Sequence, residues 1–293
     1  MRPEKQLVRD FYDSFGWRKN AAGVYGDTAT FLDARPVLAT YYRKVHRRVS
    51  QFLKPQGRYF LDAGSGAIPH PEYLEYSAGY RRRVCIDLSE QALSEARARL
   101  KGRGWYVVAD LTRLPFRDQV FDAAVCAHVL YHVPADEQAQ VIDELYRTLQ
   151  PAASAVIIYA WPTALVTLAA QRARPVISRW QRWLGRRQPG AAPGPQQAQD
   201  HPGADGAAAR PPAIYFHPHD YDWFQRTLPK NWRTEIRCWR AVDRPFTTTL
   251  IPDNWVGRAI LETVFALETL FPHAMARIGK YPMIILRKPA EPA

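Results

Sequence analysis

The chain has 293 residues, 47% of them hydrophobic, and carries a formal net charge of +12. This length and apolar share suffice for a core domain with additions, and no apolar run reaches the ~18 residues that a membrane-spanning helix requires. The first residues, MRPEKQ, lack the apolar core of a secretory signal, and three scattered cysteines exclude a disulfide framework or a C-x-x-C zinc site. We therefore expect a reduced, cytoplasmic protein.

A glycine-containing turn follows the first predicted strand. The residues before it, 1–56, predict an N-terminal helical cap with a helix at 35–53. The segment FLDAGSGAIP at 60–69 joins an apolar run to a turn, where Gly64 and Gly66 allow a sharp bend and a close approach of ligand that a Cβ would block. A strand that feeds such a turn and precedes a helix is typical of the nucleotide-binding corner of an open α/β sheet.

Apolar runs alternate with helical patterns from residue 59 to residue 160. The alternation predicts a doubly wound, mostly parallel sheet, in which ligands bind beyond the carboxyl ends of the strands. Cys85 and Cys126 fall on strands that we expect to be buried. The predicted strands are 59–62, 83–88, 105–110, 120–126 and 155–160, and the predicted helices are 90–100, with Ser89 as N-cap, and 136–149.

Three of these strands end in an aspartate: Asp62, Asp87 and Asp110. Because the carboxyl ends of parallel strands meet at one edge of the sheet, we expect the three carboxylates to converge on a ligand that has a ribose and an amine or adenine. Asp87 is placed to accept two hydrogen bonds from a ribose diol. The structural alternative for each is a helix N-cap or a solvated loop carboxylate.

Four segments in order resemble the class I S-adenosylmethionine-dependent methyltransferases, in particular their methyltransferase type 11-like cores. The segments are LDAGSG, VCIDLSEQAL, VVADLTRLPFRDQVFDAAVCAHVLYHVP and ELYRTLQPAASAVII, and they cover residues 59–159. The resemblance implies a seven-stranded Rossmann-like fold, with S-adenosylmethionine as the cofactor.

The resemblance also implies which residues contact the cofactor. In the family pattern Gly64 and Gly66 lie against the methionine part, Asp87 holds the ribose hydroxyls, and Asp110 contacts adenine. Ile68 stands where the family has a third glycine, which implies a stiffer and bulkier loop. The full set of implied cofactor contacts is Asp62, Ala63, Gly64, Ser65, Gly66, Asp87, Leu88, Asp110, Leu111, Ala127 and His128.

In the resembling family, N-terminal helices often close over cofactor and substrate. Tyr12 and Trp17, in the aromatic segment FYDSFGW, are candidates for that role here, and their rings would favour a cationic methyl donor. The alternative is an aromatic patch that packs on the sheet.

Residues 161–212 predict a basic amphipathic helix followed by a flexible linker. Residues 161–190 contain six arginines and no acid, and the apolar residues of 163–184 recur at helical spacing, with Pro175 expected to kink or divide the helix. Such a helix suits an anionic membrane surface, through residues 163–187, or a lid over an apolar or acidic substrate. An ordinary surface helix or an oligomer contact explains it equally well. Residues 188–212, rich in Pro, Gly, Ala and Gln, predict the linker.

Residues 213–293 predict the end of the sheet and an insertion that helps to form an acceptor pocket. Strands at 234–242 and 281–288 would make the family's closing antiparallel hairpin, with an apolar helix at 254–271 between them. His217 and His219, next to two aspartates, are candidate general bases, followed by His128. A structural alternative places Pro218 in a first helical turn. We do not assign a metal to the two histidines and neighbouring carboxylates.

The sequence therefore predicts transfer of a methyl group from S-adenosylmethionine to a small organic or lipid-like acceptor. The alternatives are an RNA or protein methyltransferase, prompted by the positive charge, and a cofactor-binding protein without catalysis. We regard a nucleic acid as the less favoured partner, because the basic residues gather in one amphipathic segment. The sequence leaves open the methylated atom, the acceptor and the oligomeric state.

Overall fold

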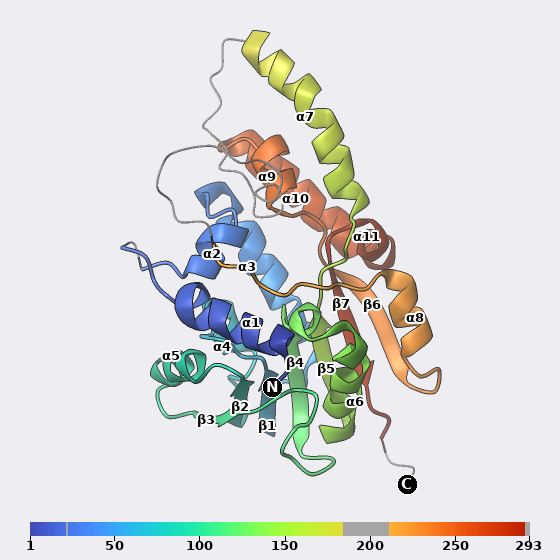
Figure 1. The fold of residues 1–293 in the computed structure, drawn as a ribbon. Helices are drawn as coiled ribbons and strands as arrows, with labels where there is room; N and C mark the ends of the chain where they lie inside the picture. Colours follow the sequence, from blue (N-terminus) through green and yellow to red (C-terminus); the bar gives the residue numbers. More distant parts are fainter. Residues whose placement is uncertain (22, 184–210, 291–293) are drawn as a thin grey trace.

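The computed structural model describes residues 1–21, 23–183 and 211–290. Within these residues a seven-stranded sheet has the strand order β3-β2-β1-β4-β5-β7-β6 (Figure 1). The first five strands pair in parallel, and β7 runs antiparallel to both β5 and β6. The predicted α/β fold class is confirmed. The strands are β1 (Gly57–Ala63), β2 (Tyr80–Asp87), β3 (Gly104–Val108), β4 (Phe121–Ala127), β5 (Leu149–Ile158), β6 (Arg233–Arg240) and β7 (Tyr281–Arg287).

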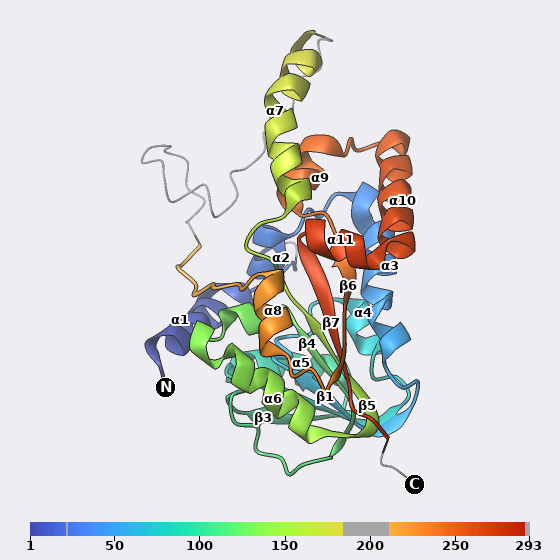
Figure 2. The same cartoon turned by 90° about the vertical axis from the view of Figure 1, so that its right-hand side faces the viewer.

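Helices cover both faces of this sheet. Helices α6 and α8 lie on one face, and α3 and α4 lie on the other (Figure 2). The central strands are buried along most of their length, as expected for parallel strands covered on both sides. The helices in the described residues are α1 (Pro3–Phe11), α2 (Gly26–Phe31), α3 (Ala39–Arg47), α4 (Pro71–Glu75), α5 (Glu90–Leu100), α6 (Gln138–Thr148), α7 (Leu165–Trp183), α8 (Tyr221–Thr227), α9 (Arg244–Leu250), α10 (Trp255–Leu270) and α11 (Pro272–Ile278).

Some predicted helices match the structure closely and one is broken. Helix α5 starts after Ser89, whose hydroxyl accepts a hydrogen bond from Ala92 N at 3.0 Å, so the predicted N-cap is confirmed. The single helix predicted at 35–53 is instead the α-helix α3 between two short 3₁₀ turns.

Two proline predictions need correction. Pro175 does not divide the basic segment, because α7 continues through it from Leu165 to Trp183. Pro218 is not in a helical turn: α8 begins after Asp220, whose side chain accepts a hydrogen bond from Trp223 N, and residue 218 precedes that cap. The predicted linker at 188–212 lies outside the described residues except for its last two.

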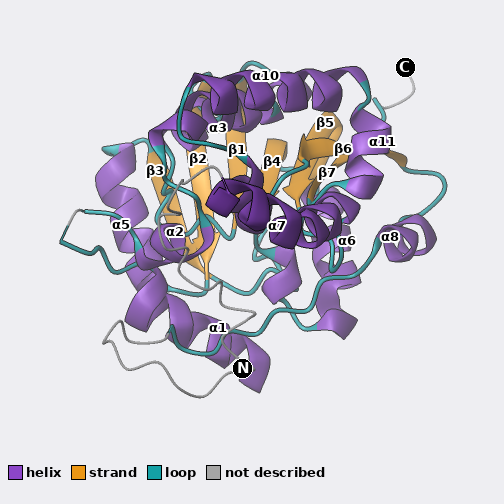
Figure 3. Ribbon diagram, turned by 90° about the horizontal axis from the view of Figure 1, so that it is seen from above, coloured by secondary structure: helices purple, strands orange, loops and turns teal. Residues whose placement is uncertain are grey.

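The carboxyl ends of the strands are enclosed by segments from several parts of the chain. Helices α1 and α2 lie on one side of these ends and α10 on the other (Figure 3). Helix α7 projects away from the sheet (Figures 1 and 2). Near its start, α7 is joined to the chain before α9 by a hydrogen bond from Thr167 Oγ1 to Asp243 Oδ2 at 2.8 Å. Among the described helices none is by itself both long and apolar enough to cross a membrane; α10 and α11 meet that test only together, bent by 112°.

A buried ion pair fixes the wall formed by α3, β6 and α10. Glu268, 1% exposed, lies 2.8 Å from Arg48 Nη1 and accepts hydrogen bonds from Tyr41 Oη at 2.6 Å and Ala241 N at 2.7 Å. Arg48 also donates to the carbonyl of Trp239. The pair thus joins elements that lie 220 residues apart in the sequence.

We expect Glu268→Ala to lower the free energy of unfolding by about 3–5 kcal/mol, because it leaves the buried Arg48 charge without a counter-ion. The matched control is Glu262→Ala, also on α10, which removes an exposed pair with Lys44 and should cost at most about 1 kcal/mol. Urea unfolding of the two variants measures the difference. Equal losses would contradict a structural role for the buried pair.

Candidate active site

A cavity of about 2350 Å³ lies at the carboxyl ends of the strands. Pockets for small ligands usually measure about 300–1000 Å³, so this cavity has room for two such ligands. All the predicted cofactor contacts line it except Ala63, which is buried in β1. The structure therefore brings residues from four strand ends to one place, namely Asp62, Gly64, Ser65, Gly66, Asp87, Leu88, Asp110, Leu111, Ala127 and His128.

The turn after β1 requires its two glycines. Gly64 has φ +70° and Gly66 has φ +52°, in the left-handed region that other residues rarely adopt. A Cβ on Gly64 would lie 2.4 Å from Val129 Cγ2, and a Cβ on Gly66 would lie 2.4 Å from Trp17 Cζ2. Both glycines are therefore required by the backbone conformation and by the close packing of Val129 and Trp17 against the turn. The turn and the carboxylates of Asp87 and Asp110 line one cavity, and together they fit S-adenosylmethionine.

Ile68, at the position where the family has a glycine, also has a positive φ of +53°. A β-branched residue in this region is uncommon and costs free energy. Its side chain is fully buried, and its N–H donates to Ser65 O at 3.3 Å. The buried side chain therefore holds the loop in this conformation.

Asp87 is hydrogen-bonded to the glycine turn and to the start of α5. Its Oδ2 accepts from Gly66 N and its Oδ1 accepts from Ser89 N, both at 2.9 Å. Burial raises the pKa of Asp87 to about 6, although the two backbone N–H groups favour the carboxylate. Each oxygen keeps a further lone pair, as a carboxylate that holds a ribose diol requires.

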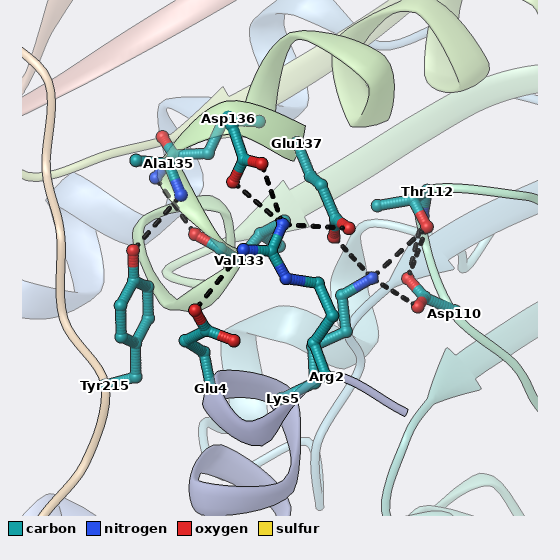
Figure 4. Close-up of polar contacts among 11 residues, drawn as sticks. Arg2, Glu4, Lys5, Asp110, Thr112, Val133, Ala135, Asp136, Glu137 and Tyr215 are labelled. Atoms are coloured by element: carbon teal, nitrogen blue, oxygen red, sulfur yellow. Dashed lines mark hydrogen bonds and ion pairs between the residues drawn. The ribbon is translucent and has the colours of Figure 1, made fainter.

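Asp110 is held by a lysine of the N-terminal helix. Lys5 Nζ lies 2.5 Å from Asp110 Oδ2 and 2.5 Å from Glu137 Oε2, and Arg2 pairs with Asp136 at 2.8 Å (Figure 4). Burial alone would raise the pKa of Asp110, but the hydrogen bonds from Lys5 and from the residue at 112 hold that pKa below its ordinary value. These contacts attach α1 to the end of β3 and to the start of α6.

Asp62 takes part in an ion pair beneath the glycine turn. Arg83 donates to Asp62 Oδ2 through Nη2 at 2.5 Å and through Nε at 2.9 Å, and both side chains are buried. Arg83 Nη1 also donates to the carbonyl of Tyr73. In this arrangement the Asp62 carboxylate supports β1 and β2.

The aromatic segment at the N-terminus lies against the cavity. The rings of Tyr12 and Trp17 stack with centroids 5.0 Å apart, and both residues line the cavity. The Trp17 ring packs directly on Gly66 and leaves no room for a Cβ there. The segment thus covers the glycine turn, which fits the closing role considered for it.

His128 is the one of the three predicted bases that lines the cavity. It follows β4 with φ +63°, and its ring lies 4.9 Å from the ring of Trp239 and 5.7 Å from that of Tyr281. Burial, together with the charge of Arg240, lowers the pKa of His128 to about 3, so the ring is neutral at pH 7 and is a weak base.

The structure does not bring His217 and His219 to the cavity. His217 N donates to Tyr131 O, and its carbonyl accepts from Gln138 Nε2 at 2.7 Å. His219 N donates to Tyr159 Oη, and the His219 ring stacks on Trp223 with centroids 4.0 Å apart. These contacts position the chain before α8. The described residues include no cluster of three or more His, Cys, Asp or Glu that would hold a metal.

A second part of the cavity is built from residues that, except for His128, sequence reasoning did not single out. We call it the aromatic compartment, and its rings come from α3, α4, the loop before α4, and the ends of β4, β6 and β7. These rings meet only through contacts between segments that are distant in the sequence. The one sequence feature that could have indicated them is that several lie near predicted strand ends. The residues of the aromatic compartment are His46, His70, Tyr73, His128, Trp239 and Tyr281.

Residues 61–157 match the family model described as a methyltransferase domain. This match supports a class I S-adenosylmethionine-dependent methyltransferase domain in this part of the chain. One curated relative is a ubiquinone/menaquinone biosynthesis C-methyltransferase UbiE from Desulfotalea psychrophila, which is 36% identical over 27% of this chain and 31% of that protein. Another is a probable tRNA methyltransferase 9B from Mus musculus, which is 32% identical over 49% of this chain and 30% of that protein. The chain thus spans about a third of the length of these relatives.

Solved structures share the fold over nearly the whole chain. A chain from the complex of the Haloferax volcanii Trm112 methyltransferase activator has a TM-score of 0.55 at 15% identity, covering 98% of this chain and 99% of that one. The cyclase SpnF has a TM-score of 0.51 at 14% identity, covering 94% and 86%. At these identities the similarity concerns the fold alone.

We expect the affinity for S-adenosylhomocysteine to fall as the pH falls from 7.5 to 5, because protonation of Asp87 near pH 6 removes the acceptor for the ribose hydroxyls. The variant Asp87→Asn should bind S-adenosylhomocysteine about 1–3 kcal/mol more weakly at pH 7.5, and its affinity should no longer depend on pH in this range. Calorimetric titration at several pH values measures both. The same pH slope in Asp87→Asn would assign the titration elsewhere, for example to Asp27, whose pKa burial also raises to about 6.

Proposed function

We propose that the chain transfers the methyl group of S-adenosylmethionine to a small organic acceptor bound in the aromatic compartment. The observation that carries the proposal is the continuity of one large cavity from the glycine turn to the aromatic compartment. Cofactor-contacting residues line one part, and six aromatic or imidazole rings line the other. A ring-lined recess of this kind suits a small acceptor better than a folded macromolecule.

The bound cofactor would supply an electrophilic methyl group on a sulfonium. The protein's residues then have to hold the acceptor in line and exclude water, which are the main contributions available in such a site. Trp17 and Tyr12 cover the glycine turn, and Lys5 fixes the covering helix. Aromatic faces near the turn favour a positive charge there.

Among the three predicted bases we propose His128 as the residue that faces the acceptor. The neutral ring of His128 lines the aromatic compartment. A neutral imidazole is able to accept a hydrogen bond from a hydroxyl or amine of the methyl acceptor. With a pKa of about 3 it positions that group more effectively than it removes a proton.

A macromolecular acceptor is the second candidate. The net charge of +12 and the relatives named as probable tRNA methyltransferases favour RNA. The enclosure of the cavity by the N-terminal segment favours the small acceptor. A role without methyl transfer remains the third candidate, since the same fold occurs in a cyclase. Membrane contact through 163–187 stays a prediction, because part of that segment lies outside the described residues.

The experiment that tests the proposal uses the full chain, methyl-labelled S-adenosylmethionine and a cell extract. We expect the label in the small-molecule or lipid fraction, and an initial rate of labelling at least about threefold lower with Asp87→Asn at a cofactor concentration near the wild-type Kd. Separation into small-molecule, lipid, RNA and protein fractions gives the readout. Label in RNA or protein would contradict the small acceptor, and no transfer to any fraction would favour a role without catalysis.

Substitution of the histidines separates the predicted bases. We expect His128→Ala to slow methyl transfer at saturating cofactor at least about tenfold, the scale of one well-placed polar contact. His217→Ala and His219→Ala should change the rate less than about twofold, because their rings lie outside the cavity lining and their backbone hydrogen bonds remain. These effects are measured as initial rates of methyl transfer from labelled S-adenosylmethionine to the extract fraction that accepts the label. A large loss in His217→Ala alone would restore it as the base.

A further inference from the structure

Four lysine or arginine side chains are buried in the part of the chain that the structure describes, and three of them have a carboxylate partner. Lys5 pairs with Asp110 and Glu137, Arg48 with Glu268, and Arg83 with Asp62. The fourth is Arg240, at the end of β6.

Arg240 forms no ion pair with any carboxylate of the described residues, although it is only 6% exposed. Its guanidinium lies over the rings of Tyr281, Tyr42 and Trp239, at 4.4, 5.1 and 5.2 Å from their centroids. Asp243 is close in sequence, but its carboxylate accepts from Phe246 N at 3.0 Å and from a threonine hydroxyl. Asp243 therefore acts on Arg240 through its charge without forming an ion pair, and Tyr281 also interacts with the guanidinium. A buried cation without an ion pair is costly, so the arrangement indicates a place for an anion.

Unpaired polar atoms cluster around the same guanidinium. Among the described residues, the buried side-chain atoms without a hydrogen-bond partner include Arg240 Nε, Trp239 Nε1 and His46 Nδ1. All three residues line the cavity. The atom in His46 lies 3.8 Å from Glu72 Oε2, beyond hydrogen-bond distance. Because an arginine Nε and an indole nitrogen only donate, they require an acceptor, and buried groups of this kind rarely remain unpaired.

The imidazoles nearby do not replace Arg240 as the source of positive charge. Burial first, and then the charge of Arg240, lowers the pKa of His70 to about 4 and that of His128 to about 3. Both rings are therefore neutral at pH 7, whereas a guanidinium stays charged.

We propose that Arg240 and Trp239 bind an oxyanion, a carboxylate or a phosphate group, that the acceptor carries into the aromatic compartment. The inference rests on the proposed function, because it assigns this anion to the acceptor of methyl transfer. A planar guanidinium binds two oxygens of such a group at once. The surrounding rings suit a flat apolar body attached to it. The substrate class is thus a small, anionic, partly aromatic or apolar compound.

The test measures binding of three probes to the full chain: phenyl phosphate, benzoate and the neutral benzyl alcohol. Each probe is titrated into the protein with and without saturating S-adenosylhomocysteine. Binding is followed by the shift in the thermal unfolding midpoint and by the change in tryptophan fluorescence. We expect either anion, but not the alcohol, to bind in both conditions, and the stronger of the two anions identifies a phosphate or a carboxylate. Binding by the alcohol equal to that of both anions would overturn the inference.

The variant Arg240→Gln should weaken binding of the preferred anion about tenfold or more, the usual scale for a charge-assisted contact. The matched control is Arg237→Gln on the same strand, because Arg237 pairs with Glu235 and does not line the cavity. This variant should bind the preferred anion with the affinity of the wild type. Should Arg240→Gln fail to fold, Arg240→Lys serves instead and should weaken binding at least about threefold, since lysine lacks the planar fork. Unchanged affinity in the folded variant would overturn the inference.

Two outcomes separate this inference from the proposed function. Loss of the anion's effect when S-adenosylhomocysteine saturates the protein would assign Arg240 to the carboxylate of the cofactor and overturn the acceptor assignment. Anion binding that depends on Arg240, in a protein that binds no S-adenosylhomocysteine and transfers no methyl group, would support the anion site and refute the methyltransferase proposal.

Discussion

The placement of the glycine turn on the end of β2 is the constraint on which the site depends. Gly64 N and Ser65 N both donate to Ile86 O, at 2.7 and 2.9 Å, and Gly66 N donates to Asp87 Oδ2. These bonds continue the parallel register of β1 and β2, in which Ala63 pairs with Ile86. The turn and the Asp87 carboxylate are therefore positioned by one run of hydrogen bonds.

The walls are joined to this centre by buried charges. Lys5 attaches the N-terminal helix to Asp110, 105 residues away in the sequence, and Arg83 supports the strand ends through Asp62. In both cases the cation is satisfied by the protein itself. The contrast with Arg240 is informative, because a fold that pairs its other buried lysine and arginine charges leaves this one facing the aromatic compartment.

Local patterns were enough to predict most of the sheet and which residues gather at its strand ends. Asp87, the two glycines and the Ser89 cap depend on residues close in sequence, so their spacing carried the information. The partners of Lys5 and the environment of Arg240 depend on segments that meet only in the folded chain, and no period in the sequence encodes that meeting. The same reason explains His217: its neighbouring acids favoured a base, but contacts with Tyr131 and with α6 turn its segment to a supporting position.

The pair between Arg48 and Glu268 has a consequence for selectivity. It orders the acceptor-side wall of α3, β6 and α10 whether or not a ligand is present. A compound that enters the aromatic compartment meets rings whose positions are already set, so little conformational entropy is lost on that side when the complex forms. Under the proposed function, discrimination between acceptors would follow from the shape and charge of these preset rings.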